Sequence, residues 1–331
     1  MDLVKETDNI INKYVNYMRY WYDRNQYSFD MHGNWYGWDN LDLFNGDIED
    51  KYLNLIKGLD SKSKDVIDRI IFRIQEYFRT GSPYFTMSDE ERTEFLNLHK
   101  HLYSKILKLS ENLYSWNGYY LPINSFEPNV FYHKYYLSEI SNLRKMKSKD
   151  IIDVGGSVGD SALIFSKYTN KKVYTFEPTT YMYENILKTI KLNNLKNVVP
   201  VKKGLGSSIT KKDIHIADAG GSTLVERKCY ECNQKETVEI TTLDDFVEHN
   251  NIKVGLIKVD IEGAEQEFLK GAINTIKKQK PVLLISIYHN FDDFFDIKPL
   301  IESWDLGYKF KIMKPMNGQV FTEVILLAER N

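Results

Sequence analysis

The stretch Ile152-Asp153-Val154-Gly155-Gly156-Ser157-Val158-Gly159-Asp160 places three glycines directly after a short apolar run. The run 150–154 predicts a strand, and residues 160–168 predict the helix that follows it. Glycine between a strand and a helix lets the backbone turn tightly and approach a ligand closely. This order is typical of a nucleotide-binding turn, although a glycine turn that only lets a helix pack on a sheet would have the same sequence.

The chain after Lys149 continues with alternating strands and helices. We expect strands at 172–177, 197–201, 255–260, 282–288, 308–313 and 320–327, with helices at 180–193, from 264 and at 293–303. Apolar strands that alternate with helices imply a mostly parallel sheet covered on both faces. The predicted fold class is therefore α/β, with a Rossmann-like sheet of seven strands whose last strand is antiparallel.

The residues before this segment lack the alternation of strands and helices. We therefore predict two regions, 1–147 and 148–331. The first is expected to be mainly helical, with helices at 65–78, at 90–113 and through Tyr135 and Leu143, and a short strand at 117–122. The loop 27–45 carries Trp35, Tyr36 and Trp38, which either stack on a sugar ring or pack on the core as part of a surface loop. An acceptor-binding or oligomerisation role is predicted for this first region.

Composition excludes several classes of protein. The net charge of −2 gives no basic field for nucleic acid or an anionic membrane, and no apolar run is long enough for a membrane helix. The N-terminus has no secretory signal pattern. Cys229 and Cys232 form a lone C-x-x-C, which lacks the second pair of a zinc site and is interpreted as two incidental thiols. We expect a cytoplasmic protein that can form a homodimer. We expect no nucleic-acid partner and no integral membrane segment.

An acidic residue follows the glycine loop at the spacing of a ribose ligand. Glu177 ends the second predicted strand, where a carboxylate accepts hydrogen bonds from both ribose hydroxyls. Asp153 is unfavourable for a pyrophosphate and favourable for an ammonium or sulfonium group, which favours S-adenosylmethionine over NAD. Gly204 and Leu205 follow the third strand and are either adenine contacts or a simple turn. The predicted cofactor residues are Asp153, Gly155, Gly156, Ser157, Gly159, Asp160, Glu177, Pro178, Gly204 and Leu205.

At this point the sequence resembles the FkbM family of S-adenosylmethionine-dependent methyltransferases. The resemblance rests on residues 152–161, on Phe176-Glu177-Pro178, on Thr242-Leu243-Asp244-Asp245-Phe246, and on the block 257–265 (IKVDIEGAE). It covers about residues 150–288 and leaves the first region untouched. The resemblance implies transfer of a methyl group to oxygen, commonly on sugars or other hydroxyl-bearing natural products.

Three side chains stand at strand ends beside the loop. Asp260 and Glu262 end the fourth strand of the second region and His289 ends the fifth, so we expect them to converge. In one interpretation His289 or Asp260 is the general base that takes the proton of an acceptor hydroxyl. In the other, Asp260, Glu262 and His289 ligate a divalent metal ion that lowers the pKa of that hydroxyl. Glu265 and Glu267 are expected to stabilise a helix start, and the loop 220–223 to close over a ligand.

The sequence thus predicts an S-adenosylmethionine-dependent O-methyltransferase. The expected acceptor is a hydroxyl of a sugar, a nucleotide sugar or a surface glycan precursor. The alternatives are an NAD-dependent oxidoreductase and a non-catalytic module that binds the cofactor.

Overall fold

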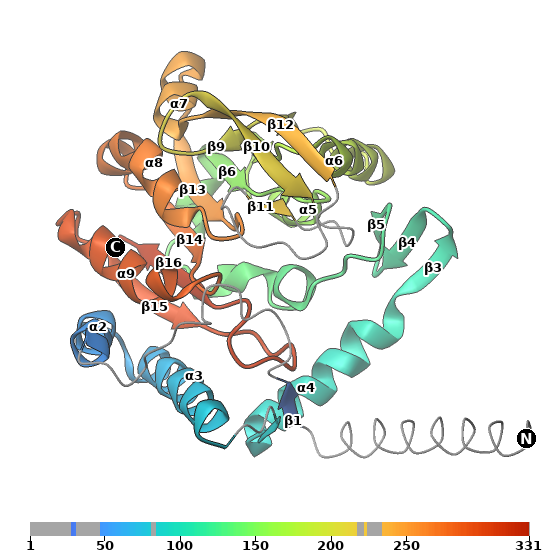
Figure 1. Ribbon diagram of the computed structural model, residues 1–331. Coiled ribbons are helices and arrows are strands. Elements are labelled where there is room, and N and C mark those ends of the chain that lie inside the picture. The colour runs from blue at the N-terminus through green and yellow to red at the C-terminus, as the bar shows by residue number, and fades with distance from the viewer. Residues whose placement is uncertain (1–27, 31–46, 81–83, 217–221, 224–233, 331) are drawn as a thin grey trace, which may run out of the picture.

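The computed structural model describes residues 28–30, 47–80, 84–216, 222–223 and 234–330. Its centre is a seven-stranded sheet with the strand order β15-β16-β14-β13-β6-β7-β8 (Figure 1). The bounds of these strands are β6 Asp150–Val154, β7 Val173–Phe176, β8 Val198–Val201, β13 Val254–Val259, β14 Val282–Ser286, β15 Lys309–Met313 and β16 Ile325–Glu329.

The direction of these strands confirms the predicted fold class. Strands β8, β7, β6, β13 and β14 pair in parallel, whereas β16 is antiparallel to both β14 and β15. The connecting helices are α5 Asp160–Phe165, α6 Thr180–Leu192, α7 Leu243–Asn250, α8 Glu265–Gln279 and α9 Phe291–Ser303. Parallel strands need such crossovers, which bring their carboxyl ends to one edge of the sheet.

Two hydrophobic cores cover the two faces of this sheet. Successive strand side chains point to opposite faces, so Ile151 enters one core and Ile152 the other. All six residues of β13 are buried, as expected for a central strand covered on both sides. The sheet is therefore a rigid base for the loops at its edge.

The first region packs on both faces rather than on one. Helices α2 Asp47–Ile56 and α3 Ser61–Thr80 contribute Leu55 and Ile67 to one core, where α2 contacts α9 and α3 contacts β15. Leu98 and Phe131 belong to the core on the opposite face. The predicted boundary at 147/148 stays a prediction, and both cores cross it.

Helix α4 is shorter than its prediction. It spans Asp89–His101, starts with a capping box between Ser88 and Glu91, and is followed by the 3-10 turn η1 Tyr103–Lys105. The residues after it form a three-stranded sheet, with β3 Leu107–Ser110, β4 Leu113–Trp116 and β5 Tyr119–Leu121. The predicted helix to residue 113 was wrong because leucines alternate with Lys108 and Ser110, which is a strand period rather than a helical one.

The predicted helix through Tyr135 and Leu143 is also wrong. Three short turns replace it: the π-helical turn η2 Pro128–Tyr132 and the 3-10 turns η3 Lys134–Glu139 and η4 Leu143–Ser148. Tyr135 and Tyr136 have φ values of 51° and 52°, which a right-handed helix cannot contain. The remaining short strands of this region, β1 Ser28–Asp30 and β2 Tyr84–Thr86, pair with each other.

A second sheet inserted after β8 was not predicted. It has the order β11-β10-β12-β9, with β9 Gly204–Leu205, β10 Thr210–Ile216, β11 Ser222–Thr223 and β12 Gln234–Thr241. The part of the predicted loop 220–223 that the structure describes is strand β11. Gly204 and Leu205 likewise form a strand, parallel to β12 at Ile240 and Thr241, rather than a simple turn.

Candidate active site

The glycine loop lies at the carboxyl end of β6 in close contact with its neighbours. A Cβ on Gly155, whose φ is +79°, would lie 1.8 Å from the backbone oxygen of Asp260. A Cβ on Gly156 would lie 2.1 Å from Oγ1 of Thr175. Both values are far below any van der Waals contact, so only glycine allows the loop to join the end of β13 to the end of β7.

Asp153 lies beneath this loop. Its carboxylate is fully buried and accepts hydrogen bonds from the hydroxyls of Ser161 and Thr175, each at 2.8 Å. Lys258 Nζ lies 3.4 Å from Asp153 Oδ1 and donates to the carbonyl of Gly155 at 2.6 Å. The structure therefore gives Asp153 partners in Ser161, Thr175 and Lys258, and its place among the cofactor residues stays a prediction.

Glu177 stands beside the loop at the end of β7, as predicted. It is buried, and its carboxylate accepts the N–H of Ser157 at 3.1 Å and both the N–H and the hydroxyl of Thr179. Burial raises its pKa above the usual value. Pro178 follows and lies 3.7 Å from the Cβ position of Gly204, so the predicted residues of the second and third strand ends are neighbours.

The structure brings the three predicted catalytic residues together. His289 Nε2 lies 3.4 Å from Asp260 Oδ1 and 3.8 Å from Glu262 Oε2. The side chains differ in exposure, since His289 is 4% exposed, Asp260 is 20% and Glu262 is 52%. A buried base with an accessible acid beside it is an arrangement suited to proton transfer from a bound hydroxyl.

Glu265 completes this cluster and was missed as a member of it. It begins α8, is fully buried and places Oε1 2.9 Å from His289 Nδ1, while it also accepts the N–H of Ile261. Burial alone would lower the pKa of His289, but the carboxylates of Glu265, Glu262 and Asp260 outweigh it and raise the pKa to about 10. From the sequence, Glu265 was expected only to stabilise a helix start; the structure adds its contact with His289.

The geometry changes the predicted metal alternative. Ligand atoms of Asp260, Glu265 and His289 lie within 4.8 Å of one another, so the compact set contains Glu265 in place of Glu262. Glu265 already accepts from Ile261 and faces His289. These contacts describe a buried ion pair, and we assign no metal ion to the cluster.

Comparison with known proteins gives this site a family. Residues 153–310 match the profile of the methyltransferase FkbM domain, a range that contains the loop, Glu177 and all four residues of the cluster. This part of the chain is similar to the FkbM methyltransferases. The range that matches the FkbM domain begins at Asp153 and ends within β15, so it leaves the first region outside.

The chain is also similar to individual methyltransferases. Methyltransferase 1 of Beauveria bassiana is 28% identical over 207 residues, which cover 55% of this chain and 81% of that protein. The hexuronic acid methyltransferase AglP of Haloferax volcanii is 28% identical over 146 residues, 43% of this chain and 58% of that protein. The crystal structure of the methyltransferase FkbM from Methylobacillus flagellatus KT has a TM-score of 0.50 at 18% identity and covers 85% of this chain and 58% of that one.

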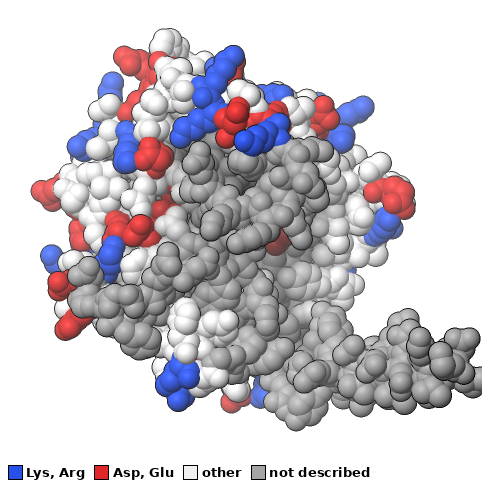
Figure 2. Space-filling model, in the orientation of Figure 1, with Lys and Arg blue, Asp and Glu red and all other residues white. Residues whose placement is uncertain are grey.

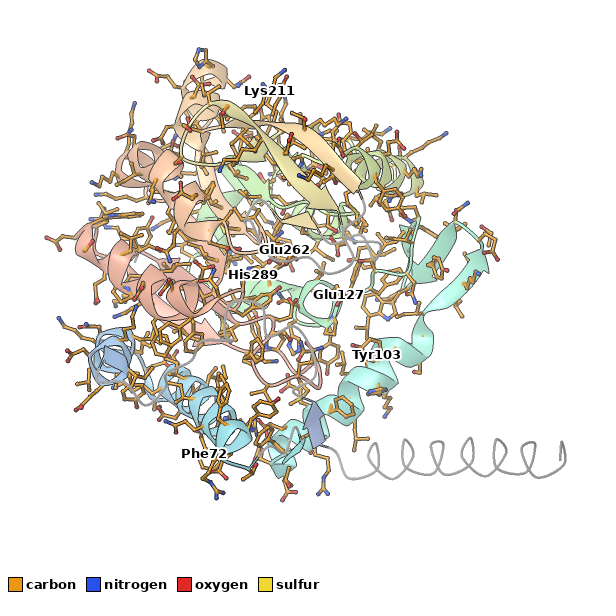
Figure 3. All side chains as sticks on the ribbon, viewed as in Figure 1. Phe72, Tyr103, Glu127, Lys211, Glu262 and His289 are labelled. Carbon is orange, nitrogen blue, oxygen red and sulfur yellow. The ribbon has the colours of Figure 1, made fainter. Side chains whose placement is uncertain are left out.

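Further acids outside the FkbM domain face its site. Glu323, which precedes β16, accepts hydrogen bonds from the Tyr288 hydroxyl at 3.2 Å and from Asn129 at 3.0 Å. Burial, followed by the charges of Asp260 and Glu127, raises the pKa of Glu323 to about 7. In Figure 3, Glu127 lies across from Glu262 and His289 at the centre of the molecule. The site is therefore strongly acidic. The sequence did not indicate the contribution of Glu127 and Glu323, because these two acids come from distant segments.

Asp160, in the first turn of α5 beside the loop, is part of this acidic environment. It is buried, and burial raises its pKa to about 7. An aspartate in the unfolded chain loses its proton at about pH 3.9. Between about pH 4 and 7, Asp160 in the folded state therefore holds a proton that it has lost in the unfolded chain. Because the folded pKa lies above the unfolded one, Asp160 reduces stability progressively as the pH rises through this window.

Asp160→Asn is therefore expected to raise the free energy of unfolding at pH 8 by about 2–4 kcal/mol, with the gain vanishing near pH 4. Urea unfolding of the variant and the wild type at a series of pH values measures this difference. Asp305→Asn, at an exposed position, serves as the control. Identical pH dependence of Asp160→Asn and the wild type would contradict the assignment.

Several predictions fall outside the described residues or concern the surface. Trp35, Tyr36, Trp38, Gly220, Gly221, Cys229 and Cys232 lie outside the described ranges. Within those ranges, no helix combines the length and apolar character that a membrane span requires. Figure 2 shows acidic and basic side chains interspersed on the described part of this face, in keeping with the small net charge.

Proposed function

We propose that the chain is an S-adenosylmethionine-dependent O-methyltransferase whose acceptor is a hydroxyl of a sugar-containing molecule. The observation that carries the proposal is the meeting of His289, Asp260 and Glu262 at the strand end that also supports Gly155. A cofactor bound on the glycine loop would lie beside a base and two acids. The methyl group on a positively charged sulfur supplies the electrophile.

The acidity of the site favours this cofactor over NAD. Asp160, Glu177 and Asp260 are close to the loop, and Glu127 adds its charge to those of Asp160 and Asp260. Carboxylates at this density oppose a pyrophosphate and attract a sulfonium or ammonium group. Asp153 supports the loop from below in this proposal, while Glu177 and the backbone of Ser157 and Gly159 hold the nucleoside. Pro178, Gly204 and Leu205 border the adenine side.

In the proposed reaction His289 takes the proton of the acceptor hydroxyl through Nε2. The three carboxylates around the ring favour its protonated form, and a cation bound beside Asp260 opposes them and lowers the pKa of His289. Asp260 and Glu262 then orient the acceptor and stabilise the imidazolium that forms. Alignment of the hydroxyl with the methyl group supplies the remainder of the rate enhancement.

The acceptor class rests on one relative, which by its name methylates a hexuronic acid. We propose that residues 1–147 form the acceptor side of the site, because Asn129 of that region donates to Glu323 and the carboxyl of Glu127 lies near enough to Asp260 for their charges to interact. The wild type should be incubated with S-adenosylmethionine and neutral hexoses, hexuronic acids and their nucleotide-linked forms. Mass spectrometry should show one added methyl group on an acceptor hydroxyl, and none with Asp260→Asn. Two results would refute O-methylation: a methyl group transferred to nitrogen, or methylation that occurs only on acceptors that lack a hydroxyl group.

A further inference from the structure

Glu265 is a fully buried acid that the proposed proton transfer does not itself use. Its Oε1 lies 2.9 Å from Nδ1 of His289, and the N–H of Ile261 donates to the same oxygen at 2.9 Å. Helix α8 begins at Glu265, so the position of its carboxylate is fixed by a long element that packs in the core through Phe268 and Leu269. A charge in such surroundings is retained only where it is well paired.

We infer that Glu265 is the positioning residue that fixes the His289 ring, with Nδ1 protonated and Nε2 directed at Asp260 and Glu262. A histidine whose Nδ1–H is bound by a carboxylate presents the other nitrogen to its ligand or substrate. Nε2 is the nitrogen that lies 3.4 Å from Asp260 Oδ1. The inference rests on the proposed function for the use of Nε2, whereas the contact between Glu265 and His289 does not depend on it.

A second buried acid supports Glu265 from behind. Asp293 lies in the first turn of α9, where Asn290 caps the helix and Gln266 donates to Oδ1 of Asp293 at 3.2 Å. Burial and the Glu265 carboxylate raise the pKa of Asp293 to about 7, and the protonated form donates to Glu265. Burial opposes the charge of Glu265, but the His289 charge and hydrogen bonds from His289 and Ile261 outweigh it and lower the pKa of Glu265, so the buried pair favours a charged Glu265.

The groups that face His289 come from three elements. Asp260 and Glu262 lie on the turn after β13, Glu265 on α8 and Asp293 on α9, while the ring of Tyr288 packs on the imidazole at 4.1 Å between centroids. Glu265 faces Nδ1 of this ring at 2.9 Å, whereas Asp260 and Glu262 face Nε2. Loss of its charge should therefore affect the Nδ1 proton more than loss of any other acid in the set.

The test is nitrogen-15 NMR of the full chain labelled at histidine, in buffer with a chelator, with the His289 signals assigned by their absence in His289→Gln. The wild type should show a protonated Nδ1 with a strongly downfield proton. In Glu265→Gln the titration midpoint of His289 should fall by about 1–3 pH units, because the amide still accepts from Nδ1 but carries no charge. The acidic limb of a turnover–pH profile, where the base becomes protonated, should move in the same direction.

Glu267→Gln is the matched control, since Glu267 lies on the same helical turn but faces Ser207 and Lys270. It should leave the His289 signals unchanged. An unchanged His289 spectrum in Glu265→Gln would overturn the inference. If that variant does not fold, the wild type alone decides, because a His289 that titrates near the ordinary value of about 6.5 would contradict the pairing. These spectra need no acceptor, so a failure of methyl transfer and a failure of the inference are distinguishable.

Discussion

Replacing Gly155 with alanine is expected to reduce affinity for S-adenosylhomocysteine by more than about tenfold, a loss of at least ~1.4 kcal/mol. The added Cβ would meet the backbone oxygen of Asp260 at 1.8 Å, so the loop must move away from the end of β13. That movement separates the backbone that holds the cofactor from the residues that act on the acceptor. Isothermal titration calorimetry of both proteins measures the effect.

Gly118→Ala is the matched control for this substitution. Gly118 has a φ of +82°, close to that of Gly155, but nothing lies within 4 Å of its Cβ position, in the turn between β4 and β5. It should lose a similar amount of stability from backbone strain and keep its affinity. A folded Gly155→Ala protein with wild-type affinity would show that the loop does not hold the cofactor.

His289→Gln is expected to lower kcat by roughly 10²–10⁴-fold, the usual contribution of a positioned acid or base. Glutamine is close in size and can still accept a hydrogen bond at the edge of the cluster, but it cannot take the acceptor proton. Because the proposed function places His289 on the acceptor side, affinity for S-adenosylhomocysteine should change by only a few fold. Single-turnover kinetics on the acceptor found in the sugar panel measures the chemical step.

His249→Gln, on the exposed face of α7, is the control and should keep full activity. A His289→Gln protein with kcat within a few fold of the wild type would remove His289 from the chemistry. The role of base would then pass to Asp260, the other candidate base that the sequence offers.

The fold could be predicted because, in the second region, the local sequence pattern agrees with the secondary structure that forms. Ile151 and Ile152 are buried in different cores, so an apolar run marks a strand covered on both faces. The glycine loop, Glu177 and Asp260 all stand at strand ends, so the residues that end the apolar runs indicated the site. The same reasoning correctly brought Asp260, Glu262 and His289 together. It could place them because the carboxyl ends of parallel strands meet at one edge.

Other parts of the site depended on contacts that no local pattern records. Glu127 and Glu323 are almost 200 residues apart, and the packing of η2 on α5 brings the segment after Glu127 next to the helix that begins at Asp160. Asp153 was expected to face a ligand because its position was predicted without Lys258, a lysine buried within an apolar strand. The pairing of β9 with β12 was missed because it joins residues separated by more than thirty positions.

The most direct test of the central claim is a calorimetric titration of the full chain with S-adenosylhomocysteine and, separately, with NAD. The acidic loop environment and the support of Gly155 by Asp260 predict saturable binding of S-adenosylhomocysteine, weakened in Gly155→Ala, and no measurable binding of NAD. Saturable binding of NAD with none of S-adenosylhomocysteine would contradict the account.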